Sequence, residues 1–108
     1  MRDGLYKVVF TTPRGSGVGV LAIQGGKVRG GDSRTYYVGT FNESNGQVTA
    51  HVKVDLHTNT TFMSSVFGID RVNITLAGSA QGDRAQLTGT AAEVPGVTFR
   101  AVLTRLAD

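Results

Sequence analysis

The side chains that could do chemistry are few, and their spacing does not bring them together. His51 and His57 lie in a segment that alternates like a β-strand, which places them on one face but about 20 Å apart at ~3.3 Å per residue. That separation is too large for both to bind one metal ion. Asp55 and His57 are close enough to bind a metal weakly if another strand supplied a ligand. A solvated polar face is the simpler interpretation, so we expect no metal site and no cofactor.

The sequence contains the residue types of a hydrolase, but their spacing does not indicate a catalytic site. Ser64 or Ser65 with His51 or His57 would supply a nucleophile and a base, but a triad also needs these groups to converge with an orienting acid. The chain has no cysteine, which excludes a thiolate nucleophile, thiolate metal ligands and disulfides. The glycines of residues 15–19 lack phosphate-loop spacing and lie in a strand-like segment. We therefore predict that the chain is not an enzyme.

The charge balance is weakly basic. Eleven Lys and Arg against eight Asp and Glu give a net charge of +3, and Arg14, Lys27, Arg29 and Arg34 cluster in sequence. Such a cluster is one way to bind nucleic acid, but the excess is small and a solvated face is the favoured interpretation, so nucleic acid is not the expected partner. The chain has no apolar stretch long enough for a signal peptide or a membrane span. We expect a cytoplasmic protein that does not bind membranes.

Period-two alternation broken by turn signals predicts an all-β domain spanning residues 1–108. Gly25-Gly26 and Asn45-Gly46 are signals for tight two-residue hairpins, and Pro95-Gly96 marks the last turn. Between residues 47 and 57 the alternation is nearly perfect, which indicates a strand with one wet face. Eight short strands in sequential hairpins favour a small antiparallel up-and-down β-barrel, because closure removes the sheet edges. A two-sheet sandwich is the alternative.

One segment departs from this alternation. Phe62, Met63, Val66 and Phe67 recur at helical spacing, and Gly68 is suited to ending a helix. We predict one short helix around residues 60–67 that covers or plugs one end of the barrel.

The first two strands are apolar on both faces, unlike the later ones. On the first strand, Leu5 and Val9 lie on one face and other apolar residues lie on the opposite face. On the second strand, Leu21 and Ile23 likewise lie opposite a second set of apolar residues. An antiparallel strand of this kind must be covered on both sides, once by the core and once by something else. We predict a homodimer whose interface contains Leu5, Val9, Leu21 and Ile23.

Several segments of the first half resemble a known family. They are residues 3–10 (DGLYKVVF), 17–21 (GVGVL), and Gly30-Gly31-Asp32 followed by residues 37–41 (YVGTF). Together they resemble the GrlR-like family, small bacterial proteins named for a negative regulator of type III secretion; the second half is similar mainly in length and pattern. The resemblance implies a lipocalin-like, eight-stranded barrel that dimerises, and a regulator that binds and sequesters a helix-turn-helix transcriptional activator.

The resemblance is incomplete at one surface. The named regulator has an acidic run after its fourth strand, and in the matching residues 42–47 (NESNGQ) only Glu43 keeps the charge. Glu43 therefore joins the predicted partner-contact residues, but an acidic binding mechanism does not carry over.

The preferred hypothesis is thus a non-enzymatic protein-interaction module, and the alternative is a lipocalin-like binder of a small apolar ligand. An eight-stranded barrel has an interior that side chains just fill or that holds one small ligand. The interior positions predicted to bind such a ligand are Tyr6, Phe10, Val52, Val54 and Phe99, with Phe62 in the covering segment.

Overall fold

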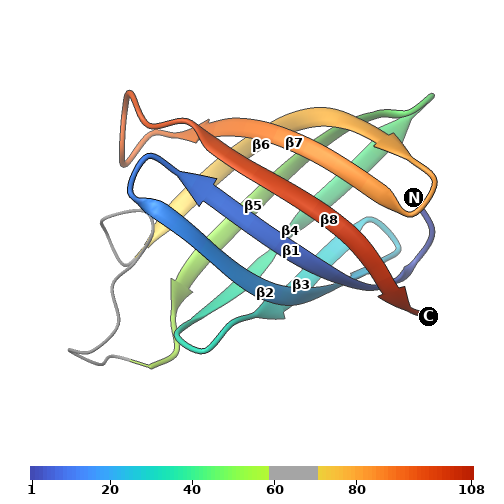
Figure 1. The fold of residues 1–108 in the computed structure, drawn as a ribbon, viewed down its shortest axis with the longest axis horizontal. Helices are drawn as coiled ribbons and strands as arrows, with labels where there is room; N and C mark the ends of the chain where they lie inside the picture. The colour runs from blue at the N-terminus through green and yellow to red at the C-terminus, as the bar shows by residue number, and fades with distance from the viewer. Residues whose placement is uncertain (59–70) are drawn as a thin grey trace.

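The computed structural model describes residues 1–58 and 71–108, which form a closed antiparallel β-barrel (Figure 1). Each strand pairs with the next along the chain, and β1 pairs with β8 to close the barrel. The predicted up-and-down barrel is confirmed, and the sandwich is excluded. The helix predicted around residues 60–67 lies outside the described residues. The strands are β1 (Gly4–Thr12), β2 (Gly15–Gln24), β3 (Lys27–Gly31), β4 (Thr35–Ser44), β5 (Gln47–Leu56), β6 (Val72–Gln81), β7 (Arg84–Ala91) and β8 (Phe99–Ala107).

The two ends of the barrel differ in their connections. At the end that also carries both termini, which we call the tight end, neighbouring strands are joined by two residues each (Figure 1). Gly25, Gly26, Asn45 and Gly46 there have positive φ angles, as the predicted hairpins require. The opposite end, which we call the loop end, holds the connection between β3 and β4 and the longer ones after β5 and β7.

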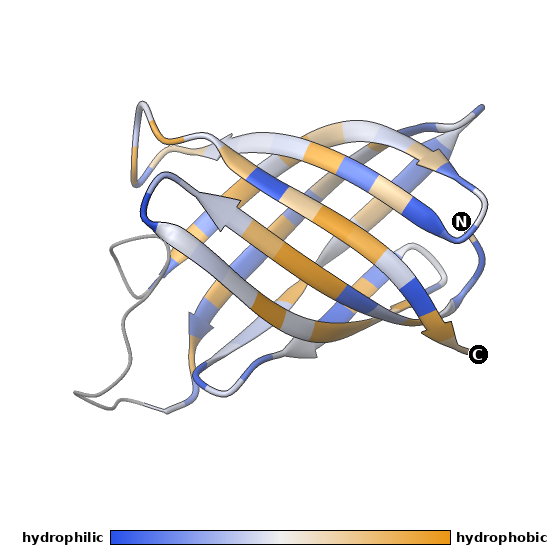
Figure 2. Ribbon diagram, viewed as in Figure 1, coloured by the Kyte–Doolittle hydropathy of each residue, from blue (hydrophilic) through white to orange (hydrophobic). Residues whose placement is uncertain are grey.

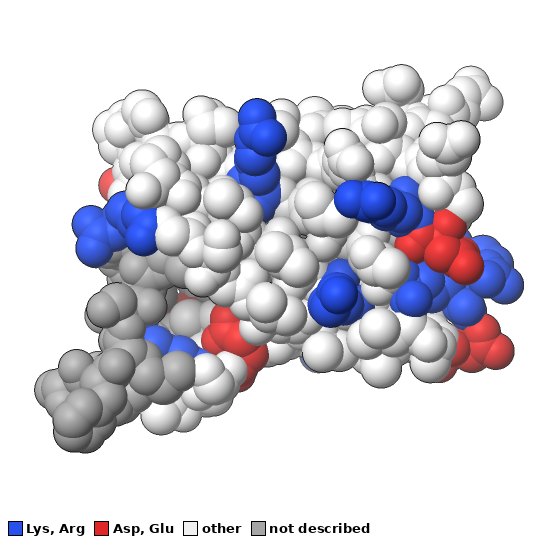
Figure 3. Space-filling view, in the orientation of Figure 1, with Lys and Arg blue, Asp and Glu red and all other residues white. Residues whose placement is uncertain are grey.

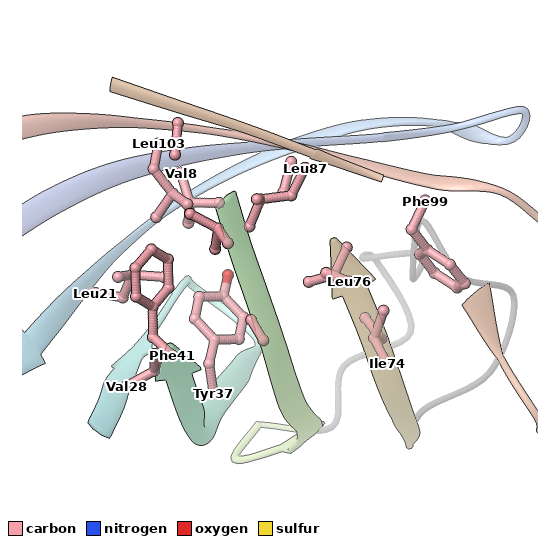
Figure 4. Packing of buried hydrophobic residues seen from close by; sticks show 14 of the residues in the cluster. Val8, Leu21, Val28, Tyr37, Phe41, Ile74, Leu76, Leu87, Phe99 and Leu103 are labelled. Atoms are coloured by element: carbon pink, nitrogen blue, oxygen red, sulfur yellow. The ribbon is translucent and has the colours of Figure 1, made fainter. Parts of the chain in front are cut away.

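The core is built from one face of every strand. Side chains that alternate along facing strands point toward one another across the interior (Figure 4). Burying these apolar side chains supplies the main driving force for folding, since each adds roughly 1.5–3 kcal/mol when fully buried. The buried side chains on the inward faces of β1, β6, β7 and β8 include Tyr6, Val8, Val72, Ile74, Leu76, Ala85, Leu87, Phe99, Ala101 and Leu103.

The predicted orientation of β2 is wrong. Leu21 and Ile23 are 6% and 3% exposed and lie inside the barrel, whereas Val18 and Val20 are 60% and 41% exposed and lie outside. The register explains this: residues directly opposite in an antiparallel pair lie on the same face, and Leu21 is opposite the buried Tyr6. Leu21 and Ile23 are therefore core residues and do not form part of a surface that a partner could contact.

No helix among the described residues is long and apolar enough to cross a membrane.

Candidate functional site

The barrel interior contains a cavity of about 50 Å³ lined almost entirely by apolar side chains. Phe10, Val52, Val54 and Phe99, predicted to bind a ligand, line it. Tyr6 is fully buried in the core but does not line the cavity, and Phe62 lies outside the described residues. An engineered cavity that binds benzene measures roughly 150 Å³. The interior as described is therefore too small even for a single aromatic ring.

A polar network closes the interior toward the loop end, and its centre is Asp32. Tyr37 projects inward from β4 and is 1% exposed, and its hydroxyl donates a hydrogen bond to the Asp32 carboxylate. The Thr35 hydroxyl lies 2.9 Å from both Asp32 carboxylate oxygens, and the backbone amides of Arg34 and Thr35 lie 2.9 and 2.6 Å from Oδ1. Asp32 thus fixes the β3–β4 connection and anchors a tyrosine that crosses the core.

The ring of Tyr37 has little room around it. It packs edge to face against Phe10 of β1, with ring centroids 5.1 Å apart. A Cβ atom at position 19 would collide with Tyr37 Oη, so Gly19 of β2 is the residue that lets the tyrosine reach Asp32. Gly19 and Asp32 thus come together through their packing around Tyr37.

The network changes the proton affinities of both partners. Burial raises the pKa of Tyr37, and the hydrogen bond to Asp32 raises it further. For Asp32, partial burial favours the neutral form, but hydrogen bonds from Tyr37, the backbone of Thr35 and Arg34, and the Thr35 hydroxyl outweigh it. The pKa of Asp32 therefore lies below its ordinary value. Both groups keep their usual charge at neutral pH, so neither is prepared for proton transfer.

Acidification should therefore weaken the barrel through Asp32. Because its folded-state pKa is depressed, its contribution to stability is present above the unfolded pKa of about 4 and is lost as the pH falls through the folded value. We expect Asp32→Asn, which keeps an acceptor for Tyr37, to be less stable than wild type near pH 7, with the difference shrinking toward pH 2. Urea unfolding midpoints across this range measure it, with Asp83→Asn as a control at an exposed carboxylate. A difference that stays constant with pH would contradict the assignment.

The histidines considered for catalysis are far from any reactive arrangement. The Nε2 atom of His57 lies 2.9 Å from the Asp32 carbonyl oxygen and donates to it, and its Nδ1 lies 2.7 Å from Thr58 Oγ1. His51 stands on the outside of β5, where its Nδ1 is 3.4 Å from Thr75 Oγ1. Ser64 and Ser65 lie outside the described residues. Across residues 1–58 and 71–108, no three His, Asp or Glu side chains are placed to hold a metal ion.

Charged side chains gather at the tight end. Arg2 Nη2 lies 3.1 Å from Asp83 Oδ1, and the guanidinium of Arg105 contacts Asp108. The hydroxyl of Tyr6 donates to the backbone carbonyl of Arg2 at 2.5 Å, and burial raises its pKa. These pairs hold the two ends of the described chain against the barrel, and Arg2, Arg105 and Asp108 line an open surface pocket there.

Glu43 lies apart from the other predicted contact residues. It stands on β4, which is separated from β2 by β3, and its partly exposed side chain contacts the amino group of Met1. The structure does not bring Glu43 together with Leu5 and Val9.

The outside of β1, β2 and β8 carries a continuous group of apolar side chains, which we call the outer apolar face. Runs of apolar residues lie side by side on these strands (Figure 2). Val9 is opposite Val18 on β2 and Val102 on β8, so three apolar side chains form one row across the barrel wall. Leu5 and Leu106 are 37% and 54% exposed. The outer apolar face consists of Leu5, Val9, Val18, Val20, Ala22, Val102 and Leu106.

This face contains two of the five predicted contact residues. Leu5 and Val9 point outward as predicted, and Val18 and Val20 take the places expected for Leu21 and Ile23. The signal for the correct residues was present, since both faces of β2 are apolar, but alternation alone did not say which face turns outward.

The comparisons with known proteins add no relative. No protein-family model matches this chain, and no curated protein matches it in sequence.

Proposed function

We propose that this protein is a non-enzymatic, cytoplasmic protein-interaction module. In this proposal it binds and sequesters a protein partner, as the GrlR-like negative regulators of type III secretion do. The observation that carries the proposal is the outer apolar face, whose Val18, Val20 and Leu106 are each more than 40% exposed. Contiguous apolar surface on a small domain marks a place where another molecule binds. A transcriptional regulator is the partner that the family resemblance suggests.

The barrel itself would act as a rigid support in this function. In the closed barrel β1 pairs with both β2 and β8, so a partner meets the side chains of these strands and cannot insert a strand between them. That the closed eight-stranded barrel is lipocalin-like is part of this proposal.

The alternative function, binding of a small apolar ligand inside the barrel, has one observation in its favour. The interior cavity is lined by apolar side chains, as such a ligand would require. Its volume of about 50 Å³ weighs against the alternative, because the barrel would have to widen before an aromatic or lipid ligand could enter.

Site-specific photo-crosslinking in the native host tests the proposed function. A photoreactive phenylalanine analogue at Val20, on the outer apolar face, is expected to crosslink to a protein; the same residue at Thr49, exposed on the outside of β5, is not. A crosslinked product identified by mass spectrometry as a second copy of the chain, or as a different protein, supports the interaction function. Absence of crosslinking at Val20, or equal crosslinking at both positions, would contradict it.

A further inference from the structure

Positive charge is concentrated on one side of the barrel. Strands β7, β8, β1, β2 and β3 are consecutive around the wall, and we call their outer surface the basic wall. Of the eleven Lys and Arg of the chain, six lie on these strands, whereas none of the eight Asp and Glu does. The six are Lys7, Lys27, Arg29, Arg84, Arg100 and Arg105.

Most of these cations are available to a partner. Arg105 is only 12% exposed and contacts Asp108, but the other five are exposed, and none of the five forms an ion pair with a described residue. In the view of Figure 3, basic groups are spread over this side of the barrel, and acidic groups appear at the right-hand end, where both termini lie, and also at the lower left.

The remaining strands do not share this imbalance. On β4, β5 and β6 the charged groups are Glu43, Lys53 and Asp55. Lys53 Nζ and Arg71 Nε both approach the Asp55 carboxylate, at 4.0 and 3.0 Å. Charges on that side are therefore compensated within the chain, and those of the basic wall are not.

The cations surround the outer apolar face. Arg29 on β3 is opposite Ala22, and Arg84 on β7 is opposite Thr104 of β8, so cations border the apolar row on both sides. Lys7 lies within it, opposite Val20. A surface with an apolar centre and a charged border is the usual plan of a protein-binding site, in which the border selects the partner by charge.

We propose that the partner of the basic wall is a protein whose contact surface is acidic and bears apolar side chains. This inference rests on the proposed function and names the chemistry of its partner. Burying Val18 and Val20 requires apolar groups from the partner, and the uncompensated Lys7, Arg29 and Arg84 require carboxylates. Acidic residues around an apolar centre supply both.

A second copy of the chain fits this surface less well. In a two-fold symmetric contact the same patch meets itself, so the basic wall would face another basic wall that has no acidic residue on its strands. Like charges across an interface oppose association. The homodimer was predicted from the apolar residues alone, without the charges that surround them.

Nucleic acid also fits less well. Proteins that bind single strands stack bases on exposed aromatic side chains. The aromatic residues of the five strands are Tyr6, Phe10 and Phe99, and all three point into the barrel. Apart from Lys7, the exposed centre offers only aliphatic groups, which contribute nothing to binding phosphates.

Binding of defined probes to the purified chain tests the inference. The first probe is a synthetic peptide of about 20 residues that presents leucines on one helical face and glutamates on the other. The second has the same composition in scrambled order. An oligonucleotide of similar length and vesicles of anionic phosphatidylglycerol represent the other partner classes. We expect the amphipathic acidic peptide to bind most tightly, to weaken with added salt, and to shift backbone amide resonances of β8, β1 and β2.

Charge-reversal variants locate the binding. Lys7→Glu and Arg29→Glu are each expected to weaken peptide binding about tenfold. Arg14→Glu makes the same change at an exposed position in the β1–β2 turn, outside the wall, and is expected to leave binding within about twofold. Far-UV circular dichroism confirms that each variant is folded.

Several outcomes would overturn the inference. They are tighter binding of the oligonucleotide or the vesicles, equal binding of both peptides, no binding of either peptide, or an equal loss in Arg14→Glu. A symmetric dimer that buries Val20 at physiological salt would also overturn it while leaving the interaction function intact. If Val20 yields no crosslink to any protein, the proposed function fails as well, so the two failures can be told apart.

Discussion

Replacing Leu21 with alanine is expected to lower the free energy of unfolding by about 2–5 kcal/mol, whereas Val20→Ala, one residue earlier, should cost about 1 kcal/mol or less. Leu21 is 6% exposed and lines the interior cavity, so truncation removes buried apolar surface and enlarges a void. Val20 is 41% exposed on the outside of the same strand and loses little on truncation in the isolated protein.

Equilibrium urea unfolding followed by far-UV circular dichroism measures both changes under the same conditions. Ile23→Ala, at the other inward position of β2, serves as a second large-effect variant, and Val18→Ala as a second small one. If Val20→Ala cost as much as Leu21→Ala in the monomer, or more, the orientation of β2 would be reversed. The outer apolar face would then lose its most exposed members.

The inward and outward faces could be assigned from the sequence for β5 but not for β2. On β5, polar residues such as Thr49 and His51 alternate with valine and alanine, so the wet face was visible in the sequence. On β2, residues 15–19 are mostly glycine and both remaining faces are apolar, so alternation carries no direction. The direction is set by pairing with β1, where Tyr6 must be inside, and pairing register is a tertiary property.

The basic wall was hidden from the sequence for a related reason. Lys27 and Arg29 appeared as a local cluster with Arg14 and Arg34, which the fold places elsewhere, in connections at the loop end. Of the residues that complete the wall, Lys7 comes from β1 and the other three come from β7 and β8, more than fifty residues after Arg29. The cations of the wall come together only because β8 pairs with β1, and no local sequence pattern predicts that pairing.

The interior network was only partly foreseeable. Glycine and aspartate in residues 30–32 predict a loop before the strand that carries Tyr37, but nothing in the spacing predicts that Asp32 binds Tyr37. The contact depends on β4 turning Tyr37 inward and on Gly19, from a different strand, leaving space beside its hydroxyl. A glycine that leaves space for a large side chain can be recognised only once the strand register is known.

Replacing Asp32 with alanine is expected to destabilise the barrel by about 2–4 kcal/mol near neutral pH, because it leaves the buried Tyr37 hydroxyl without its acceptor. The same change removes the acceptor of two backbone amides and the Thr35 hydroxyl in the β3–β4 connection. Tyr37→Phe removes the hydroxyl itself, keeps the ring against Phe10, and should cost less, about 1–2 kcal/mol.

A double-mutant cycle measures the link between these two residues. In Asp32→Ala with Tyr37→Phe, no buried hydroxyl remains to be satisfied, so the combined loss should be smaller than the sum of the single losses by about 1 kcal/mol. Simple additivity would mean that the two side chains stabilise the barrel independently.

The coupling also bears on function, because the network joins β4 to the β3–β4 connection and packs against β1 and β2. A partner that binds the outer apolar face needs those strands held rigid, since a preorganised surface loses less conformational entropy on binding. Asp32→Ala should therefore weaken partner binding at the outer apolar face even though Asp32 is not part of that face, whereas Glu93→Ala, which removes only exposed contacts to Asn73, should not.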